Sequence, residues 1–133
     1  ALNEGIIQPC YIWEDIIFSH AGVSKTWCTN HSIKTNLLEM SIQDLFEKDK
    51  MAFGFQMPHK MSMFPDWSGD DVWQSPLWIR PKSLHKDKLD GYRQVVGHSQ
   101  VSKIAELDGI ILIDYLPNGY LVIEDGEFKP VDL

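Results

Sequence analysis

The sequence contains few cysteines and no long apolar run, and each absence excludes a class of protein. Two cysteines, Cys10 and Cys28, cannot form a disulfide framework or a cysteine-type zinc site, so we expect two reduced thiols in a core. No apolar run approaches the roughly 18 residues of a membrane span, and no basic segment precedes an apolar one as in a signal peptide. The sequence therefore predicts a cytoplasmic protein that does not contact membranes.

Basic residues are also scarce. The chain has 12 Lys and Arg against 19 Asp and Glu, which gives a net charge of -7. A nonspecific nucleic-acid binder needs a basic surface to displace counterions, so we expect no nucleic-acid binding. What the sequence does contain is 44% hydrophobic residues over 133 positions, which suits one globular domain with one core.

Short strands are predicted in both halves of the chain. The stretch "PCYIWEDIIFSH" (9–20) indicates two strands around the polar pair Glu14-Asp15, and "YRQVVGHS" (92–99) indicates a third. Three further strands are predicted to form a meander with hairpin turns at Asn118-Gly119 and Asp125-Gly126. They are "IILIDYL" (110–116), "GYLVIED" (119–125) and "EFKPVDL" (127–133).

One segment, "NLLEMSIQDLFEKDK" (36–50), carries a strong helix signal. Its apolar residues Leu38, Ile42, Leu45 and Phe46 fall on one helical face, and Asn36 followed by Glu39 resembles a capping box. The segment 26–33 is predicted to be irregular, 51–75 a long loop, 76–81 a short extended piece, and 83–90 either one helical turn or a polar loop.

Two histidines stand at the ends of predicted strands. His20 ends "DIIFSH" and is followed by Ala21-Gly22, and His98 ends "RQVVGH" after Gly97. Strand ends with glycine-containing turns are where α/β folds place ligands, and a neutral imidazole binds Zn, Fe or Mn. The matching contexts make a shared metal site one interpretation, and since 78 residues separate the two histidines, only the fold could build it. The alternative at either position alone is a hydrogen-bonded turn histidine.

Four motifs, "FSHAGVS", "SPLWIRP", "YRQVVGHSQV" and "IILIDYLPNGYLVIEDGEFKPV", extend this hypothesis. In this order and spacing they resemble the C-terminal half of a calcineurin-like metallophosphoesterase. The branch they resemble most holds the serine/threonine protein phosphatases and the symmetrical diadenosine tetraphosphatases. The resemblance covers roughly residues 9 to 131. It implies an α/β fold that is the C-terminal part of an αββα sandwich, mostly strands of the second sheet with one clear helix and a long loop.

The resemblance also implies roles for three residues. His20 and His98 would bind the second ion of a two-metal centre, with Mn, Fe or Zn left open, and Arg80 would contact the substrate phosphate. Two adjacent divalent ions clamp a phosphoryl group and activate a bound water, and an arginine fork donates paired hydrogen bonds to phosphate oxygens. Without the resemblance, Arg80 would be a surface arginine packed on Trp78. Gln100 stands where many members have a second histidine, which favours the phosphatase-like branch.

The motifs of the family's first half, GDxH, GDxxDRG and GNHE, are not found. The stretches "SGDDVW" (68–73) and "TNHSI" (29–33) match only in part and are not assigned, and His31, His59 and His85 are expected to face solvent. Since the chain begins at Ala1 without these motifs, we expect residues 1–133 to form one domain that is the C-terminal fragment of a catalytic domain. Such a fragment would hold no catalytic residue and be inactive alone.

The sequence thus predicts a metal-dependent phosphoesterase with a binuclear centre and a phosphoprotein or nucleotide as its substrate. Two alternatives stay open: a non-catalytic phosphatase-like interaction module, and a dinucleoside polyphosphate hydrolase. A homo-oligomer is also predicted, because the helix at 36–50 and the loop at 51–75 cannot cover all of one apolar sheet face. That face would contain Ile16, Phe18, Val95, Ile111, Ile113 and Val122.

Overall fold

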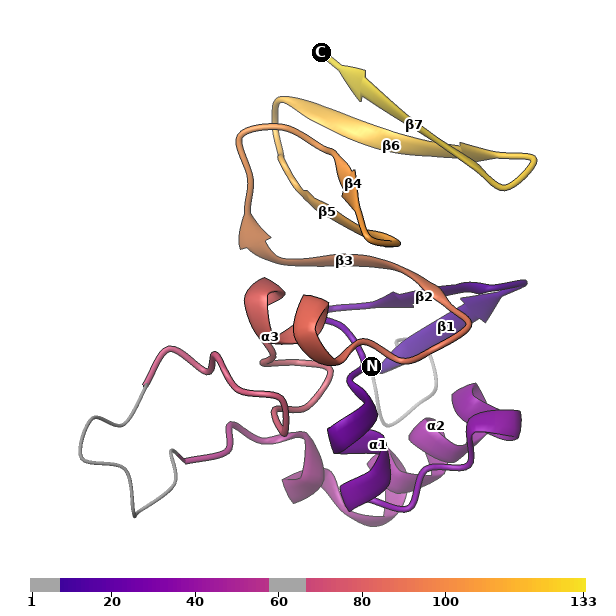
Figure 1. Ribbon diagram of the computed structural model, residues 1–133, viewed down its shortest axis with the longest axis vertical. Coiled ribbons are helices and arrows are strands. Elements are labelled where there is room, and N and C mark those ends of the chain that lie inside the picture. The colour runs from indigo at the N-terminus through magenta and orange to yellow at the C-terminus, as the bar shows by residue number, and fades with distance from the viewer. Residues whose placement is uncertain (1–7, 58–66) are drawn as a thin grey trace.

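The computed structural model describes residues 8–57 and 67–133 (Figure 1). Within these ranges the chain is a mixed α/β fold with a five-stranded mixed sheet, a separate two-stranded hairpin and three short α-helices. The strand order of the large sheet is β1-β2-β3-β5-β4. Its strands are β1 (Cys10–Trp13), β2 (Ile16–Ser19), β3 (Arg93–Gln100), β4 (Glu106–Leu107) and β5 (Ile110–Asp114).

The pairing of the strands decides which strand ends meet. Strands β1 and β2 are antiparallel, as a tight hairpin requires, whereas β2 with β3 and β3 with β5 are parallel. Ser19 at the end of β2 pairs with Val96 of β3. The residues that follow β2 and those in the last part of β3 therefore meet at the same edge of the sheet.

The predicted helix is present as α2 (Leu38–Lys48) between two short 3₁₀ segments, Thr35–Leu37 and Lys50–Phe53. Leu38, Ile42 and Phe46 are buried, as the apolar spacing predicts. The predicted capping box is wrong, because no side chain caps α2. The carboxylate of Glu39 instead accepts a hydrogen bond from the backbone N–H of Ile12 at 2.7 Å, which satisfies a donor of strand β1.

Two short helices were not predicted clearly. Helix α1 (Lys25–Asn30) occupies the segment expected to be irregular, since Ser24 Oγ accepts a hydrogen bond from Trp27 N at 3.1 Å and caps the helix. The indole of Trp27 is fully buried, so core packing stabilises a helix too short to show a period. For the segment 83–90, the helical alternative is confirmed, because helix α3 (Pro81–Asp87) includes its first part. The residues before α3 form a turn rather than the predicted extended piece.

The two faces of the large sheet are covered by different elements (Figure 1). Ile17 packs in a cluster with residues of α1 and α2, and Val96 and Ile110 pack with Leu84 of α3. The opposite face presents Ile16, Val95 and Ile111. Against this face lie three partly buried side chains of the C-terminal hairpin, Leu121, Ile123 and Phe128.

The C-terminal hairpin corrects the predicted meander. Strands β6 (Gly119–Glu124) and β7 (Glu127–Asp132) pair with each other, and the turn at Asp125-Gly126 is confirmed, with φ of 52° and 75° as a type I′ turn requires. The turn predicted at Asn118-Gly119 is wrong as a hairpin, because β5 and β6 lie in different sheets. Packing on the sheet face buries apolar side chains that pairing at the edge would leave outside.

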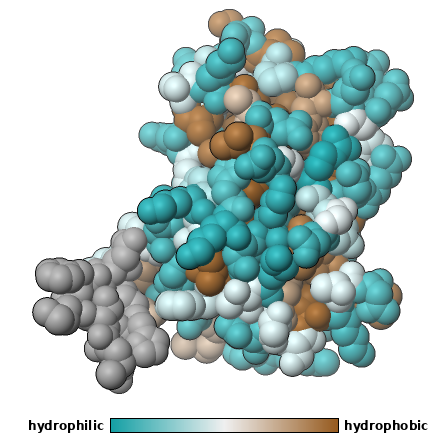
Figure 2. All heavy atoms as spheres, viewed as in Figure 1, coloured by the Kyte–Doolittle hydropathy of each residue, from teal (hydrophilic) through white to brown (hydrophobic). Residues whose placement is uncertain are grey.

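The hairpin also changes the expected exposed face. It covers part of the surface that α2 and the loop at 51–75 were expected to leave open, and Val122 points away from it with 36% of its surface exposed. Residues 58–66 of that loop lie outside the described residues. The homo-oligomer stays a prediction. The visible face of the molecule is mostly hydrophilic, with hydrophobic residues in small separate groups (Figure 2).

Arg93 fixes the hairpin to the large sheet. Its Nε and Nη2 donate to the two carboxylate oxygens of Asp15 at 3.0 Å each, and its Nη1 donates to the carbonyl of Gly126 at 2.6 Å. The guanidinium carbon lies 4.8 Å from the centre of the Phe128 ring. One side chain of β3 thus holds the β1–β2 turn and the hairpin turn together.

None of the helices in residues 8–57 and 67–133 combines the length and the apolar character that a membrane span requires.

Both cysteines are buried free thiols, as expected, and this leads to a prediction. Burial raises the pKa of Cys10 and of Cys28 to about 12, and the nearby carboxylates of Glu39 and Asp87 respectively add to the effect. Because the thiolate is the reactive form, we expect neither thiol to react with Ellman's reagent at pH 8 in the folded protein. Both should react in guanidinium chloride, and rapid reaction in native buffer would contradict the burial.

Candidate functional site

The predicted histidines are in direct contact. Nε2 of His20 lies 2.9 Å from Nδ1 of His98, and the ring centres are 4.8 Å apart with the ring planes at 65°. The two residues are 78 positions apart in the sequence, so the contact depends on the parallel pairing of β2 with β3. The fold therefore brings together the two residues that their strand-end positions singled out.

The backbone of His98 adopts an unusual conformation. Its φ is +64°, in the left-handed region that residues other than glycine seldom occupy, and the register of β3 against β5 shifts between Val96 and Gln100. A bulge of this kind re-aims a side chain, and a strained backbone costs about 1–3 kcal/mol that the surrounding structure must offset. Such strain is concentrated at functional sites, and here it turns the imidazole toward His20.

The turn after His20 explains why only small residues follow this histidine. Gly22 has a φ of +119°, and a Cβ added there would lie 2.3 Å from Cδ2 of Leu84. Ala21 N donates to the Pro76 carbonyl at 2.7 Å, and Gly97 N donates to the His20 carbonyl at 2.9 Å. The turn is therefore packed closely between α3, the segment before it and the end of β3.

The environment of His98 favours its neutral form. Partial burial lowers the pKa of His98, and the electrostatic effects of His20 and Arg80 lower it further, against smaller opposing effects of the Trp78 backbone and Asp114. Its second ring nitrogen, Nε2, is buried and has no hydrogen-bond partner of normal geometry within the described residues. A neutral imidazole has one protonated ring nitrogen and one lone pair, and with the proton on Nε2 the lone pair lies on Nδ1, the nitrogen that is 2.9 Å from Nε2 of His20 and the one that would bind a metal ion.

Arg80 lies near this histidine pair. Its Nε donates to the carbonyl of Ser68 at 2.8 Å, and its charge is close enough to act on the pKa of His98. The ring of Trp78, two residues earlier, packs edge-on against the rings of Phe55 and His98, with centres 5.4 and 6.0 Å away. The segment before α3 thus places a cation and a half-exposed indole beside His98.

Other motifs and histidines lie elsewhere in the fold. In "SGDDVW", Asp70 accepts hydrogen bonds from the N–H and the hydroxyl of Ser83, so this residue holds the first turn of α3. His31 is partly exposed and packs against the Trp27 ring. His85 is partly exposed, with its Nδ1 buried, and His59 lies outside the described residues.

The histidine pair partly fits a metal ion. Two nitrogen atoms bound to one ion at about 2.0–2.1 Å lie roughly 2.9 Å apart at a right angle and 3.4 Å apart at a tetrahedral angle. The observed separation of 2.9 Å lies within this range. In residues 8–57 and 67–133, no group of three or more His, Cys, Asp or Glu side chains is placed to hold a metal ion. The described residues thus supply two ligands, and a closed site needs more.

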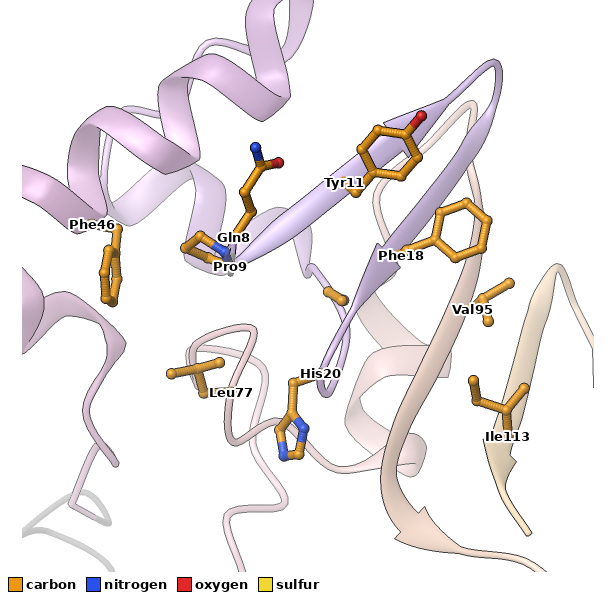
Figure 3. A pocket seen from close by; sticks show the side chains of 10 residues that line it. Gln8, Pro9, Tyr11, Phe18, His20, Phe46, Leu77, Val95 and Ile113 are labelled. Carbon is orange, nitrogen blue, oxygen red and sulfur yellow. The ribbon is translucent and has the colours of Figure 1, made fainter. Parts of the chain in front are cut away.

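A cavity that the sequence gave no means of finding opens beside His20 (Figure 3). Its volume is about 700 Å³, and Tyr11 and Phe18 lie side by side in its wall with ring centres 6.0 Å apart. No local pattern marks it, because its wall combines both strands of the first hairpin with α2, β3, β5 and a loop. It is lined by Gln8, Pro9, Tyr11, Phe18, Ser19, His20, Phe46, Leu77, Val95 and Ile113.

Comparison of the chain with models of protein families, with curated proteins and with solved structures gives no match.

Proposed function

We propose that this chain supplies one half of a binuclear metallophosphoesterase centre, in which His20 and His98 hold one divalent ion and Arg80 binds the substrate phosphate. The observation that carries the proposal is the contact of 2.9 Å between Nε2 of His20 and Nδ1 of His98. Two imidazoles from the ends of parallel strands meet there, and one of them sits on a strained backbone. Mn, Fe and Zn are the candidate ions, since imidazole ligands accept all three.

The roles of the side chains follow from their chemistry. When bound, the ions would clamp a phosphoryl group and lower the pKa of a water for in-line attack. The neutral state of His98 keeps a nitrogen lone pair available as a ligand near neutral pH. Among the described residues, Nε of Arg80 donates to the Ser68 carbonyl, and the N–H groups at Nη1 and Nη2 are of the kind that suits phosphate oxygens.

The proposed binuclear centre requires ligands from a longer protein. The described residues offer two ligands, whereas a binuclear centre needs further ligands and a bridging carboxylate. We therefore place this chain as the C-terminal part of an αββα catalytic domain, with the missing ligands on another polypeptide segment. Its substrates would be phosphoproteins or nucleotides, whose phosphate meets Arg80.

Zn²⁺ titration of the whole chain tests the proposal. In isothermal calorimetry near pH 7.5, we expect His20→Ala and His98→Ala each to weaken Zn²⁺ binding by about tenfold or more, since each removes one of two ligands. His31→Ala is the control, because it removes an imidazole that packs against Trp27 and leaves the pair intact. Equal affinities in all four proteins would contradict the metal site and favour the non-catalytic module.

A further inference from the structure

Gln94 of strand β3 makes an unusual pair of hydrogen bonds to the turn that carries His20. Its side chain is fully buried, with Oε1 accepting from Val23 N at 2.8 Å and Nε2 donating to the Val23 carbonyl at 2.9 Å. Val23 is the third residue after His20, and Gln94 lies four residues before His98 on the same strand. Strand β3 thus carries His98 and, through Gln94, also holds the turn that carries His20. We call the two hydrogen bonds between Gln94 and Val23 the clamp.

The chemistry of the clamp limits which residue can provide it. Strand β2 ends at Ser19, so the backbone of Val23 has no ladder partner in that sheet and its two polar groups must be satisfied in another way. A primary amide offers one acceptor and two donors from a single side chain, and it can therefore serve an N–H and a carbonyl together. An ionised carboxylate can replace only the acceptor, and an apolar side chain replaces neither.

The clamp completes the fixation of the turn. The first part of the turn is held by the hydrogen bonds of Gly97 N to the His20 carbonyl and of Ala21 N to the Pro76 carbonyl. Gln94 holds its last part at Val23. The backbone that carries His20 is thus tied to β3 on both sides of Gly22.

We propose that Gln94 is a positioning residue for the His20–His98 pair: its amide ties the turn to β3 and thereby sets the distance between the two imidazoles. This inference rests on the proposed function where it concerns metal binding. The distance between the rings can be tested without a metal. Residues that orient metal ligands without touching the metal typically change affinity by about 10–100-fold when they are replaced.

The chain contains a matched control for this proposal. Gln74 is also buried, and its amide makes the same two bonds to the backbone of Gln56, with Oε1 accepting at 2.9 Å and Nε2 donating at 2.8 Å. Gln94→Met and Gln74→Met therefore remove the same pair of backbone hydrogen bonds at nearly equal burial, and Gln74→Met also removes a longer bond from Nε2 to Asp71 at 3.4 Å. Only Gln94→Met removes a tether of the His20 turn. Urea unfolding of both variants identifies conditions in which each stays folded.

The first measurement is Zn²⁺ affinity by calorimetry on the folded variants. We expect Gln94→Met to weaken binding by about tenfold or more and Gln74→Met to change it by less than about threefold. Similar affinities for Gln94→Met and the unsubstituted chain would overturn the role of Gln94 in metal binding. If the unsubstituted chain and His20→Ala bind Zn²⁺ equally, the metal site itself fails, and the positioning role is decided by the second measurement.

The second measurement uses NMR on the metal-free chain. Nuclear Overhauser contacts between the rings of His20 and His98 should be present in the unsubstituted chain and in Gln74→Met and be lost in Gln94→Met. Their retention in Gln94→Met would overturn the proposal whatever the metal result. If Gln94→Met does not fold, Gln94→Asn takes its place, because it keeps an amide but is one methylene shorter and so does not reach both backbone groups of Val23. The same loss of ring contacts is expected for it.

Discussion

Residues 1–133 by themselves should hydrolyse p-nitrophenyl phosphate no faster than Mn²⁺ in buffer. In a longer protein that completes the metal centre, His20→Ala or His98→Ala should lower kcat/KM by about 10³-fold. The described residues place two ligands together and no third, so the isolated chain cannot hold two bridged ions. In the completed protein, loss of one ligand removes several kcal/mol of transition-state stabilisation, and each 1.36 kcal/mol corresponds to about tenfold in rate.

Steady-state assays with added Mn²⁺ or Zn²⁺ measure both parts of this prediction. His31→Ala serves as the control in the longer protein, because its ring packs against Trp27 of α1 rather than against the His20–His98 pair. Its activity should stay within about twofold of the unsubstituted protein, as expected for a partly exposed position away from the site. Robust metal-dependent turnover by residues 1–133 alone would show that the chain holds a complete centre, and the proposal would then be wrong.

Gly22→Ala should destabilise the fold by about 3 kcal/mol or more, a large part of the roughly 5–15 kcal/mol that stabilises an ordinary domain. Two costs add at this position. A φ of +119° strains any residue with a Cβ, by about 1–3 kcal/mol. The new methyl would also lie 2.3 and 2.7 Å from the two δ-carbons of Leu84, a fully buried residue with little room to move, and overpacking costs about 1–3 kcal/mol.

Gly91→Ala is the matched control for this prediction. Gly91 also has a positive φ, +81°, but a Cβ added there meets no atom within 4 Å. We therefore expect Gly91→Ala to cost about 1 kcal/mol from backbone strain alone, and the difference between the two variants measures the contact with Leu84. Urea unfolding followed by tryptophan fluorescence gives both values, and equal midpoints would mean that α3 moves aside freely.

The local patterns of the sequence were sufficient for several elements. The strands around Glu14-Asp15, the apolar face of α2 and the turn at Asp125-Gly126 all depend on neighbouring residues, and the structure contains all three. These three features are encoded within one turn, one period or one strand. The approach of His20 to His98 was expected from the matching ends of two apolar strands together with the family resemblance, and it depends on the parallel pairing of β2 with β3.

Other features were decided only by tertiary structure. Helix α1 exists because Trp27 is buried in a core that includes residues far along the chain, such as Phe53 and Leu89, and no period in six residues could show this. The C-terminal hairpin packs on a sheet face instead of extending the sheet, since Leu121 and Phe128 bury apolar surface there.

The sequence by itself determined most of the strands, the place of the one long helix and the two histidines to compare, but it did not indicate strand β4. Only the tertiary structure decided how that meeting is held, through the bulge at His98, the contact of Gly22 with Leu84 and the two hydrogen bonds of Gln94 to Val23. The physical reason is the range of the interactions. Propensity and periodicity act within about ten residues, whereas the partner of a buried amide or of a glycine is set by packing between segments distant in sequence.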